Sequence, residues 1–249
     1  MVKDRFDRIY GIGLTAIFLF VGTITALHHE MWRDEIQAWL LARDSTSLLD
    51  LYRNLKYEGH PGLWHTCLLI LSRFTQSPSI MQMFHLLIAA TTVYLFGRYS
   101  PFTRLQKFLF AFGYFSLYEY SIVCRNYALG VLLICLFCVL FQQRYSRFLW
   151  VGAVLFLLGH TSVHALIVSI VLSSALLVEY IFRRKCRLAG NSIKEWQILI
   201  GLSLMGLGLL TSVLQIIPPS NSGFAIEWYT RYDADRMAKV IKTITHVFF

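Results

Sequence analysis

The sequence has few charged residues. Asp, Glu, Lys and Arg make up 15% of the 249 residues, whereas a soluble globular domain usually has about 25%. Hydrophobic residues make up 56% of the chain, and the mean hydropathy is +0.55. This composition excludes a soluble domain, and we expect an integral membrane protein that crosses the bilayer several times.

Metal and redox motifs are also missing. The five cysteines lie at positions 67, 124, 135, 138 and 186, and the close pair Cys135 and Cys138 falls inside an apolar run. A redox pair or a zinc knuckle requires thiolates in contact with water. We therefore interpret the cysteines as small apolar fillers. The histidines do not form an HExxH motif, which disfavours a metalloprotease.

Acidic residues are fewer than basic ones. The chain has 14 Asp and Glu against 23 Lys and Arg, and its formal net charge is +9. The Lys and Arg residues lie in short clusters between apolar runs rather than along one face of a helix. This pattern is typical of cytoplasmic loops in membrane proteins, so we expect no nucleic-acid partner.

Placing the basic clusters in the cytoplasm predicts the topology. The fold class is all-α, with about 7–8 membrane helices, and residues 1–249 form a single transmembrane domain. Clear spans are expected at about 10–27, 108–122, 127–142, 148–160, 163–182 and 196–217. Residues 62–97 contain two apolar helices, 62–76 and 78–97, yet must make one net crossing. Either the first of them is re-entrant or the topology is shifted.

This topology leaves residues 28–60 as the first external loop, which concentrates acidic residues. Asp34 and Glu35 begin a short amphipathic helix on the membrane surface, and Ser47 and Asp50 have the spacing of a capping box for a second one. Acids in the first turn also favour the helix dipole, so a purely structural role for Asp34 and Glu35 stays open. Tryptophans of this region are predicted to anchor at the membrane interface: Trp32, Trp39 and Trp64.

The loop ends in Gly59-His60-Pro61, where the chain returns to lipid. A first apolar span, an Asp-Glu pair and a Gly-His-Pro turn in this order resemble the GT-C superfamily of integral-membrane glycosyltransferases. The sequence is most similar to the branch of protein O-mannosyltransferases and aminoarabinose transferases, over about residues 8–182. That branch has a second proline where this chain has Gly62. A less specific similarity is Arg125-Asn126-Tyr127 at the start of a span.

The resemblance implies transfer of a sugar from a polyprenyl-phosphate donor to an acceptor hydroxyl at the outer membrane face. A carboxylate is needed to activate the hydroxyl and cations to hold the phosphate, so Asp34 and Glu35 are the candidate catalytic residues. His60, Arg125 and Tyr127 are candidates for binding the phosphate or substrate, because an Arg fork suits phosphate geometry. Whether Asp34 holds a divalent metal ion is left open. The acceptor, which is a glycan, a lipid or a protein, is left open as well.

Alternatives remain for the whole chain and for one site residue. A membrane transporter or lipid-binding protein without catalysis is the alternative function, although internal repeats and mid-membrane charges are missing. Arg125 has Glu119 as an alternative partner. Members of the family continue with further spans, so we expect residues 218–249 to be an incomplete external segment. A plasma or inner membrane is favoured over the endoplasmic reticulum.

Overall fold

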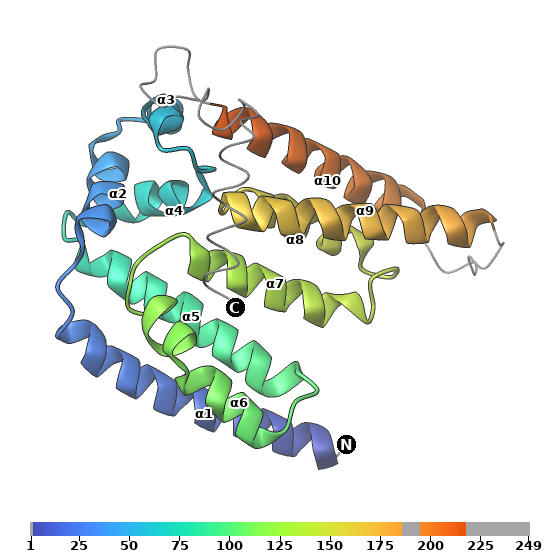
Figure 1. The fold of residues 1–249 in the computed structure, drawn as a ribbon, viewed down its shortest axis with the longest axis horizontal. Helices are drawn as coiled ribbons and strands as arrows, with labels where there is room; N and C mark the ends of the chain where they lie inside the picture. The colour runs from blue at the N-terminus through green and yellow to red at the C-terminus, as the bar shows by residue number, and fades with distance from the viewer. Residues whose placement is uncertain (1, 186–194, 218–249) are drawn as a thin grey trace, which may run out of the picture. The chain divides into compact units, whose positions relative to one another are not determined.

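The computed structural model describes residues 2–185 and 195–217. The chain divides into two units, residues 1–217 and 218–249, and the expectation for residues 218–249 lies outside the described residues. Within the described part all regular structure is helical, which confirms the all-α prediction (Figure 1). The helices are α1 (Val2–Leu27), α2 (Arg33–Asp44), α3 (Leu48–Asn54), α4 (Leu63–Ser72), α5 (Ser79–Tyr99), α6 (Arg104–Phe112), α7 (Tyr127–Phe141), α8 (Phe148–Gly159), α9 (Val163–Lys185) and α10 (Glu195–Ile216), with a 3₁₀ turn at Leu55–Tyr57 and a π-helical turn at Phe115–Glu119.

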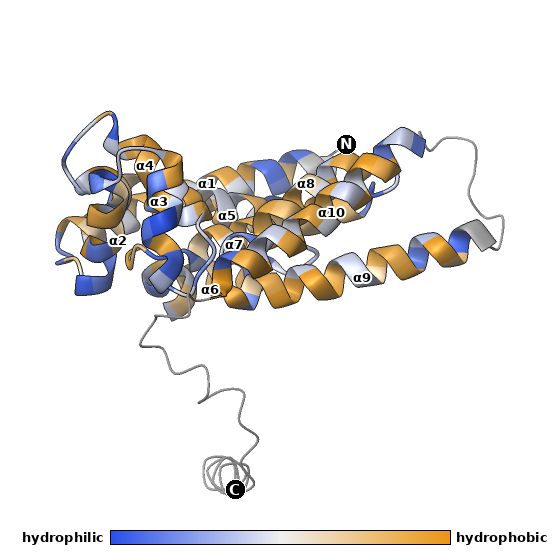
Figure 2. Cartoon of the chain, turned by 90° about the horizontal axis from the view of Figure 1, so that it is seen from above, coloured by the Kyte–Doolittle hydropathy of each residue, from blue (hydrophilic) through white to orange (hydrophobic). Residues whose placement is uncertain are grey.

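Four helices of the described part are long and apolar enough to cross a membrane, namely α1, α5, α9 and α10. Crossing the hydrocarbon core takes about 20 apolar residues. The apolar helices α4, α7 and α8 are shorter, with 10, 15 and 12 residues. Figure 2 shows hydrophobic residues along the long helices and hydrophilic residues on α2, α3 and the turns. These features indicate a multi-pass membrane protein.

The predicted span at 108–122 is not a continuous helix. The helix α6 ends at Phe112, Gly113 is extended with φ −70° and ψ 158°, and the chain continues in the π-helical turn. A Cβ atom at Gly113 would lie 2.8 Å from the Leu109 carbonyl oxygen. The break leads into residues 120–126, and π-helical turns often occur near functional sites.

The helix α4 does not cross the bundle. Figure 1 shows it beside α2 and α3, at the end of the bundle where α5 begins. Trp64 and Leu68 of α4 belong to one buried cluster with Trp39 of α2 and Leu51 of α3. Of the two helices within residues 62–97, α5 alone is long and apolar enough to cross a membrane, and the choice between a re-entrant first helix and a shifted topology stays a prediction.

Two tryptophans differ from the prediction of interfacial anchors. Trp39 and Trp64 are 1% and 2% exposed, because α2 and α4 pack against each other through them. Trp32 at the start of α2 is 49% exposed. Residue type alone predicted a lipid contact, but the packing of the two short helices buries both indoles.

Hydrogen bonds tie the turn before α4 to two later helices. The Gly62 N–H donates to the side-chain oxygen of Gln215 in α10 at 3.0 Å, and the Leu63 N–H donates to the carbonyl oxygen of His160 at 3.1 Å. A Cβ atom at Gly62 would lie 2.8 Å from the Tyr52 ring. A proline at this position would have no N–H to donate. The local packing therefore requires glycine where the resembling family has proline.

Glycines also bring long helices close together. A Cβ atom at Gly97 of α5 would lie 3.3 Å from the Gly11 Cα atom of α1, and one at Gly152 of α8 would lie 2.6 Å from the Gly201 carbonyl oxygen of α10. Small residues at helix crossings are typical of membrane bundles.

Candidate functional site

A polar cleft lies at the end of the bundle that contains α2 and the start of α4. Its cavity volume is about 280 Å³, near the lower end of the range of about 300–1,000 Å³ for small-molecule sites. Three stretches of the chain line it: Asp34, Gln37 and Ala38; Glu58, His60, Trp64 and His65; and Cys124, Arg125, Asn126 and Tyr127. Four of the five predicted site residues thus line one cleft, namely Asp34, His60, Arg125 and Tyr127.

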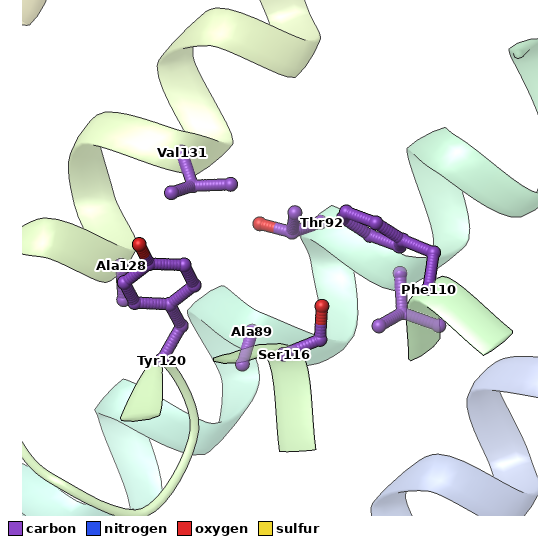
Figure 3. Close-up of a pocket in the computed structure, with 8 residues that line it drawn as sticks. Ala89, Thr92, Phe110, Ser116, Tyr120, Ala128 and Val131 are labelled. Atoms are coloured by element: carbon purple, nitrogen blue, oxygen red, sulfur yellow. The ribbon is translucent and has the colours of Figure 1, made fainter. Parts of the chain in front are cut away.

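A second, much smaller void lies among α5, α6, the π-helical turn and α7. Its volume is about 10 Å³, and its lining carries no carboxylate, imidazole, lysine or arginine. Figure 3 shows Tyr120, Ser116 and Thr92 among the apolar side chains around it. This void is too small for an organic ligand. Two larger cavities, of about 450 and 530 Å³, contain none of the five predicted site residues, so the polar cleft is the candidate site.

An ion pair joins two of the predicted residues in the cleft. The Nη2 atom of Arg125 donates a hydrogen bond to the Oδ2 atom of Asp34, and the two side chains are 32% and 61% exposed. The alternative partner of Arg125 is wrong, because the Glu119 carboxylate instead accepts a hydrogen bond from the Tyr114 hydroxyl at 3.4 Å. A carboxylate at the start of α2 and a guanidinium just before α7 are therefore neighbours.

Glu35, the fifth predicted residue, lies beneath the cleft and does not line it. It is fully buried, and its carboxylate accepts hydrogen bonds from the Trp32 N–H and the Cys124 N–H, both at 2.7 Å. The same carboxylate lies 3.0 Å from the Nε2 atom of His29. Glu35 therefore caps α2 and also fixes the backbone next to Arg125. Its place in the structure is that of a positioning residue.

His85 of α5 supports the same backbone from the other side. Its Nδ1 atom lies 3.1 Å from the Ser121 carbonyl oxygen. Its Nε2 atom lies 3.1 Å from the Arg125 carbonyl oxygen and 3.3 Å from the Arg125 backbone nitrogen. Sequence reasoning missed this residue, although a histidine inside an apolar span was a usable signal.

A second carboxylate lines the cleft beside the ion pair. Glu58 accepts a hydrogen bond from the Gln37 side-chain nitrogen at 3.0 Å, and Gln37 lies three residues after Asp34 on α2. Sequence reasoning counted Glu58 among the loop acids but gave it no role, and Gln37 had no distinguishing signal. The cleft therefore contains two carboxylates near one guanidinium.

His60 contributes hydrogen bonding rather than positive charge. Burial lowers the pKa of its imidazole below the ordinary value of 6.5; the negative charge of Glu58 opposes this, and the positive charges of His164 and Arg125 add to it. The ring is therefore neutral at pH 7. Arg125 is the one Arg or Lys side chain that lines the cleft in the described part of the chain.

Tyr127 and Asn126 stand where the cleft meets α7. Asn126 donates a hydrogen bond to the Thr161 carbonyl oxygen at 2.9 Å, which ties this corner to the turn between α8 and α9. The Tyr127 ring packs edge-on against His164, with ring centroids 6.3 Å apart. Tyr127, which was predicted to bind substrate, lines the cleft, but it makes no contact that defines its role.

The side chains near Asp34 do not fit a metal ion held by the protein alone. Across residues 2–185 and 195–217, no three His, Cys, Asp or Glu side chains are grouped as metal ligands. The Asp34 carboxylate faces a guanidinium instead. We therefore derive no chemical step through a metal ion.

Comparison with protein-family models, with curated proteins and with solved structures finds no match to this chain. The argument for a function therefore rests on the residues of the cleft.

Proposed function

We propose that the cleft is the active site of a membrane glycosyltransferase. Its donor is a sugar on a polyprenyl phosphate, and its acceptor is a hydroxyl group at the outer face of a plasma or inner membrane. The observation that supports the proposal is the pairing of Asp34 with Arg125 across 91 positions of sequence, in a cleft at one end of an apolar bundle. A lipid-linked donor needs this location, because its phosphate lies at the membrane surface.

The proposed chemistry assigns one task to each of the paired groups. The Arg125 fork binds the donor phosphate with two hydrogen bonds. Asp34 accepts the proton of the acceptor hydroxyl while the oxygen of that hydroxyl attacks the anomeric carbon of the sugar. The bond from that carbon to the phosphate oxygen breaks, and polyprenyl phosphate leaves with both electrons of the bond. The anomeric configuration is inverted.

The ion pair also has a consequence for the order of events. In the ligand-free cleft the carboxylate and the guanidinium neutralise each other. A phosphate that binds Arg125 displaces Asp34, and the released carboxylate is then free to act as a base. Donor binding therefore prepares the group that activates the acceptor.

A transporter remains the competing function, and the broken segment at Gly113 is the observation that favours it. Against it, the charged groups of the cleft lie at one end of the bundle and not at its middle (Figure 2). We propose that α7, α8 and the broken segment complete the four long helices to a bundle of about seven membrane segments.

The test is Asp34→Asn, with Asp44→Asn as the matched control. Asp44 lies at the other end of α2, pairs with Arg43 and does not line the cleft. The purified chain in lipid nanodiscs is given radiolabelled undecaprenyl phosphate-linked hexoses and aminopentoses together with a glycan, a lipid and a peptide that carry acceptor hydroxyls, and loss of label from the donor lipid is measured. Asp34 is the second residue of α2, where an acid favours the helix dipole by only about 0.3–1 kcal/mol. Only a catalytic role therefore predicts a fall of about 10²–10⁴ in rate for Asp34→Asn.

Asp44→Asn is expected to keep the wild-type rate. If Asp34→Asn keeps its rate within a few-fold, Asp34 is a helix-start residue and not the base. If the wild-type chain releases sugar from none of these lipids, the glycosyltransferase function is lost as a whole.

A further inference from the structure

Three residues that line the cleft each carry a buried polar atom with no hydrogen-bond partner among the described residues. The atoms are Nδ1 of His60, Nε1 of Trp64 and Nδ1 of His65. Trp64 and His65 are 2% and 6% exposed. Buried polar atoms in proteins are nearly always hydrogen-bonded, because leaving them unpaired is costly. Three such atoms on residues 60–65, a short stretch that lines the cleft, therefore point to a ligand.

The gathering is particular to the cleft. Elsewhere in the described part, unpartnered buried atoms such as Ser173 Oγ and Ser212 Oγ are isolated hydroxyls on α9 and α10. Trp39 also has an unpartnered indole nitrogen and belongs to the same buried cluster as Trp64, but it does not line the cleft. Trp39 is therefore a natural control for Trp64.

The chemistry of these atoms suits hydroxyl groups and not an anion. An indole nitrogen only donates, and a neutral imidazole nitrogen donates or accepts according to its tautomer. Two of the N–H groups at the start of α4 are already taken by protein acceptors. The Gly62 N–H is taken by Gln215, and the Leu63 N–H is taken by the His160 carbonyl. Arg125 therefore remains the group proposed to bind the phosphate.

The wall that carries these atoms is held in place. The Trp64 ring stacks on Phe84 with centroids 6.2 Å apart and an interplanar angle of 16°, and it meets His85 edge-on at 5.6 Å. Rings fixed in this way lose little freedom when a ligand binds, which favours affinity and selectivity.

We propose that His60, Trp64 and His65 form a hydroxyl subsite that holds the sugar of the donor while Arg125 holds its phosphate. This inference rests on the proposed function, and it assigns the choice of sugar to α4 and the turn before it. The Trp64 indole nitrogen only donates, and the two imidazole nitrogens either donate or accept. Together they suit hydrogen bonds to several neutral hydroxyl groups.

The experiment compares two lipids, undecaprenyl phosphate with and without a hexose, for binding to the chain in nanodiscs. Trp64→Phe removes the indole N–H and keeps an aromatic ring, and His65→Phe removes Nδ1 and keeps a ring. Each is expected to weaken binding of the glycosylated lipid about three- to ten-fold, the usual effect of one lost neutral hydrogen bond. Binding of the bare lipid should not change. Trp39→Phe, which also removes an indole N–H from this buried cluster, should change the affinity for neither the glycosylated nor the bare lipid.

A second measurement uses soluble methyl hexosides with saturation-transfer NMR on the same nanodiscs. Suppose that the bare lipid binds, and that neither Trp64→Phe nor His65→Phe lowers the affinity for the glycosylated lipid. The hydroxyl subsite is then overturned and the phosphate site survives. If methyl hexosides bind and Trp64→Phe abolishes this while neither lipid binds, the subsite stands and the lipid-donor function falls. Binding of no lipid and no hexoside overturns both. Equal loss in Trp39→Phe and Trp64→Phe would show a packing effect and also overturn the subsite.

Discussion

Asp34 and Arg125 show how one contact between side chains sets two properties of the cleft. The two side chains form an ion pair. In the proposed mechanism the guanidinium attracts a phosphate, and the bound phosphate releases the carboxylate. Each residue therefore affects donor affinity, but in opposite directions.

Replacement of Arg125 by Lys tests whether Arg125 binds the phosphate of the donor. An ammonium group cannot make the paired contact of a guanidinium, so Arg125→Lys should weaken binding of undecaprenyl phosphate about tenfold or more. Asp34→Asn should strengthen it, because the variant removes the carboxylate that competes for Arg125. Both are measured by lipid titration in nanodiscs, with Arg53→Lys on α3 as a control outside the cleft. Equal affinity for Arg125→Lys and wild type would remove Arg125 from the site.

The pH dependence of binding tests the state of His60. A folded-state pKa below 6.5 means that the ring is neutral above pH 6.5 and takes up a proton only as the pH falls further. Neutral His60 therefore favours the folded state above pH 6.5, and this contribution is lost as the pH falls towards the folded-state pKa. The glycosylated lipid is a phosphodiester and keeps one charge throughout, so we expect its affinity to be flat from pH 8 to 6.5.

A histidine that binds phosphate as a cation gives a different curve. Affinity would then rise as the pH falls from 8 to 6.5, and His60→Gln would abolish the rise. That pair of results would contradict the assignment of His60 to the hydroxyl subsite.

At the scale of elements, the turn before α4 is the part that adjusts the cleft. Gly59 has φ +66°, a conformation that favours glycine, and Gly62 lies against Tyr52 and Leu55. These two glycines let the chain reverse tightly enough for His60 and His65 to face the same space.

Gly62→Pro introduces the residue of the resembling family and should nevertheless destabilise this chain. It removes the N–H that binds Gln215 and adds carbon atoms that would lie 2.8 and 2.9 Å from Tyr52 and Leu55. A lost buried hydrogen bond together with overpacking should cost about 2–4 kcal/mol. Thermal unfolding in detergent measures the effect. Gly13→Ala in α1, where an added Cβ atom meets nothing within 4 Å, is the control and should be neutral or slightly stabilising. A Gly62→Pro protein as stable as wild type would contradict the packing argument.

Local sequence patterns predicted most helices, because apolar runs and their ends are local signals. The spans expected at 127–142, 148–160 and 163–182 are close to the observed α7, α8 and α9. The break at Gly113 was missed because a single glycine in an apolar run does not by itself predict a break. Whether α4 crosses the membrane was left open, because hydropathy shows that a segment is apolar but not in which direction it runs.

The same limit applies to the cleft. Asp34, His60 and Arg125 stood out because charged or polar residues next to apolar runs are unusual. Trp64 and His65 did not, because their significance depends on unpartnered atoms that only the packing of α2 against α4 reveals. The contact of Glu35 with Cys124 is also tertiary, since Cys124 lies 89 positions away.

For the whole molecule, the positions of the loops predict which side of the membrane each one faces. Figure 1 shows α3 at one end of the bundle and the α7–α8 turn at the other. In a cysteine-free background, a cysteine at Asp50 on α3 should react with an impermeant maleimide on intact cells, and one at Ser146 in the α7–α8 turn should react only after the cells are opened. Reaction at Ser146 without reaction at Asp50 would place the cleft in the cytoplasm and end the proposal of an outer-face site.

The bonds from Gly62 to Gln215 and from Leu63 to His160 also have a consequence for biosynthesis. A nascent chain that has emerged only as far as α7 already contains Asp34, Arg125 and all of α4. It does not yet contain the two oxygen acceptors that fix the start of α4. Because chains are made and folded from the N-terminus onward, the cleft takes its final shape only after α10 has joined the bundle. A ribosome that stalls within α9 would therefore leave a membrane-inserted intermediate that contains Asp34 and Arg125 but has an unformed cleft.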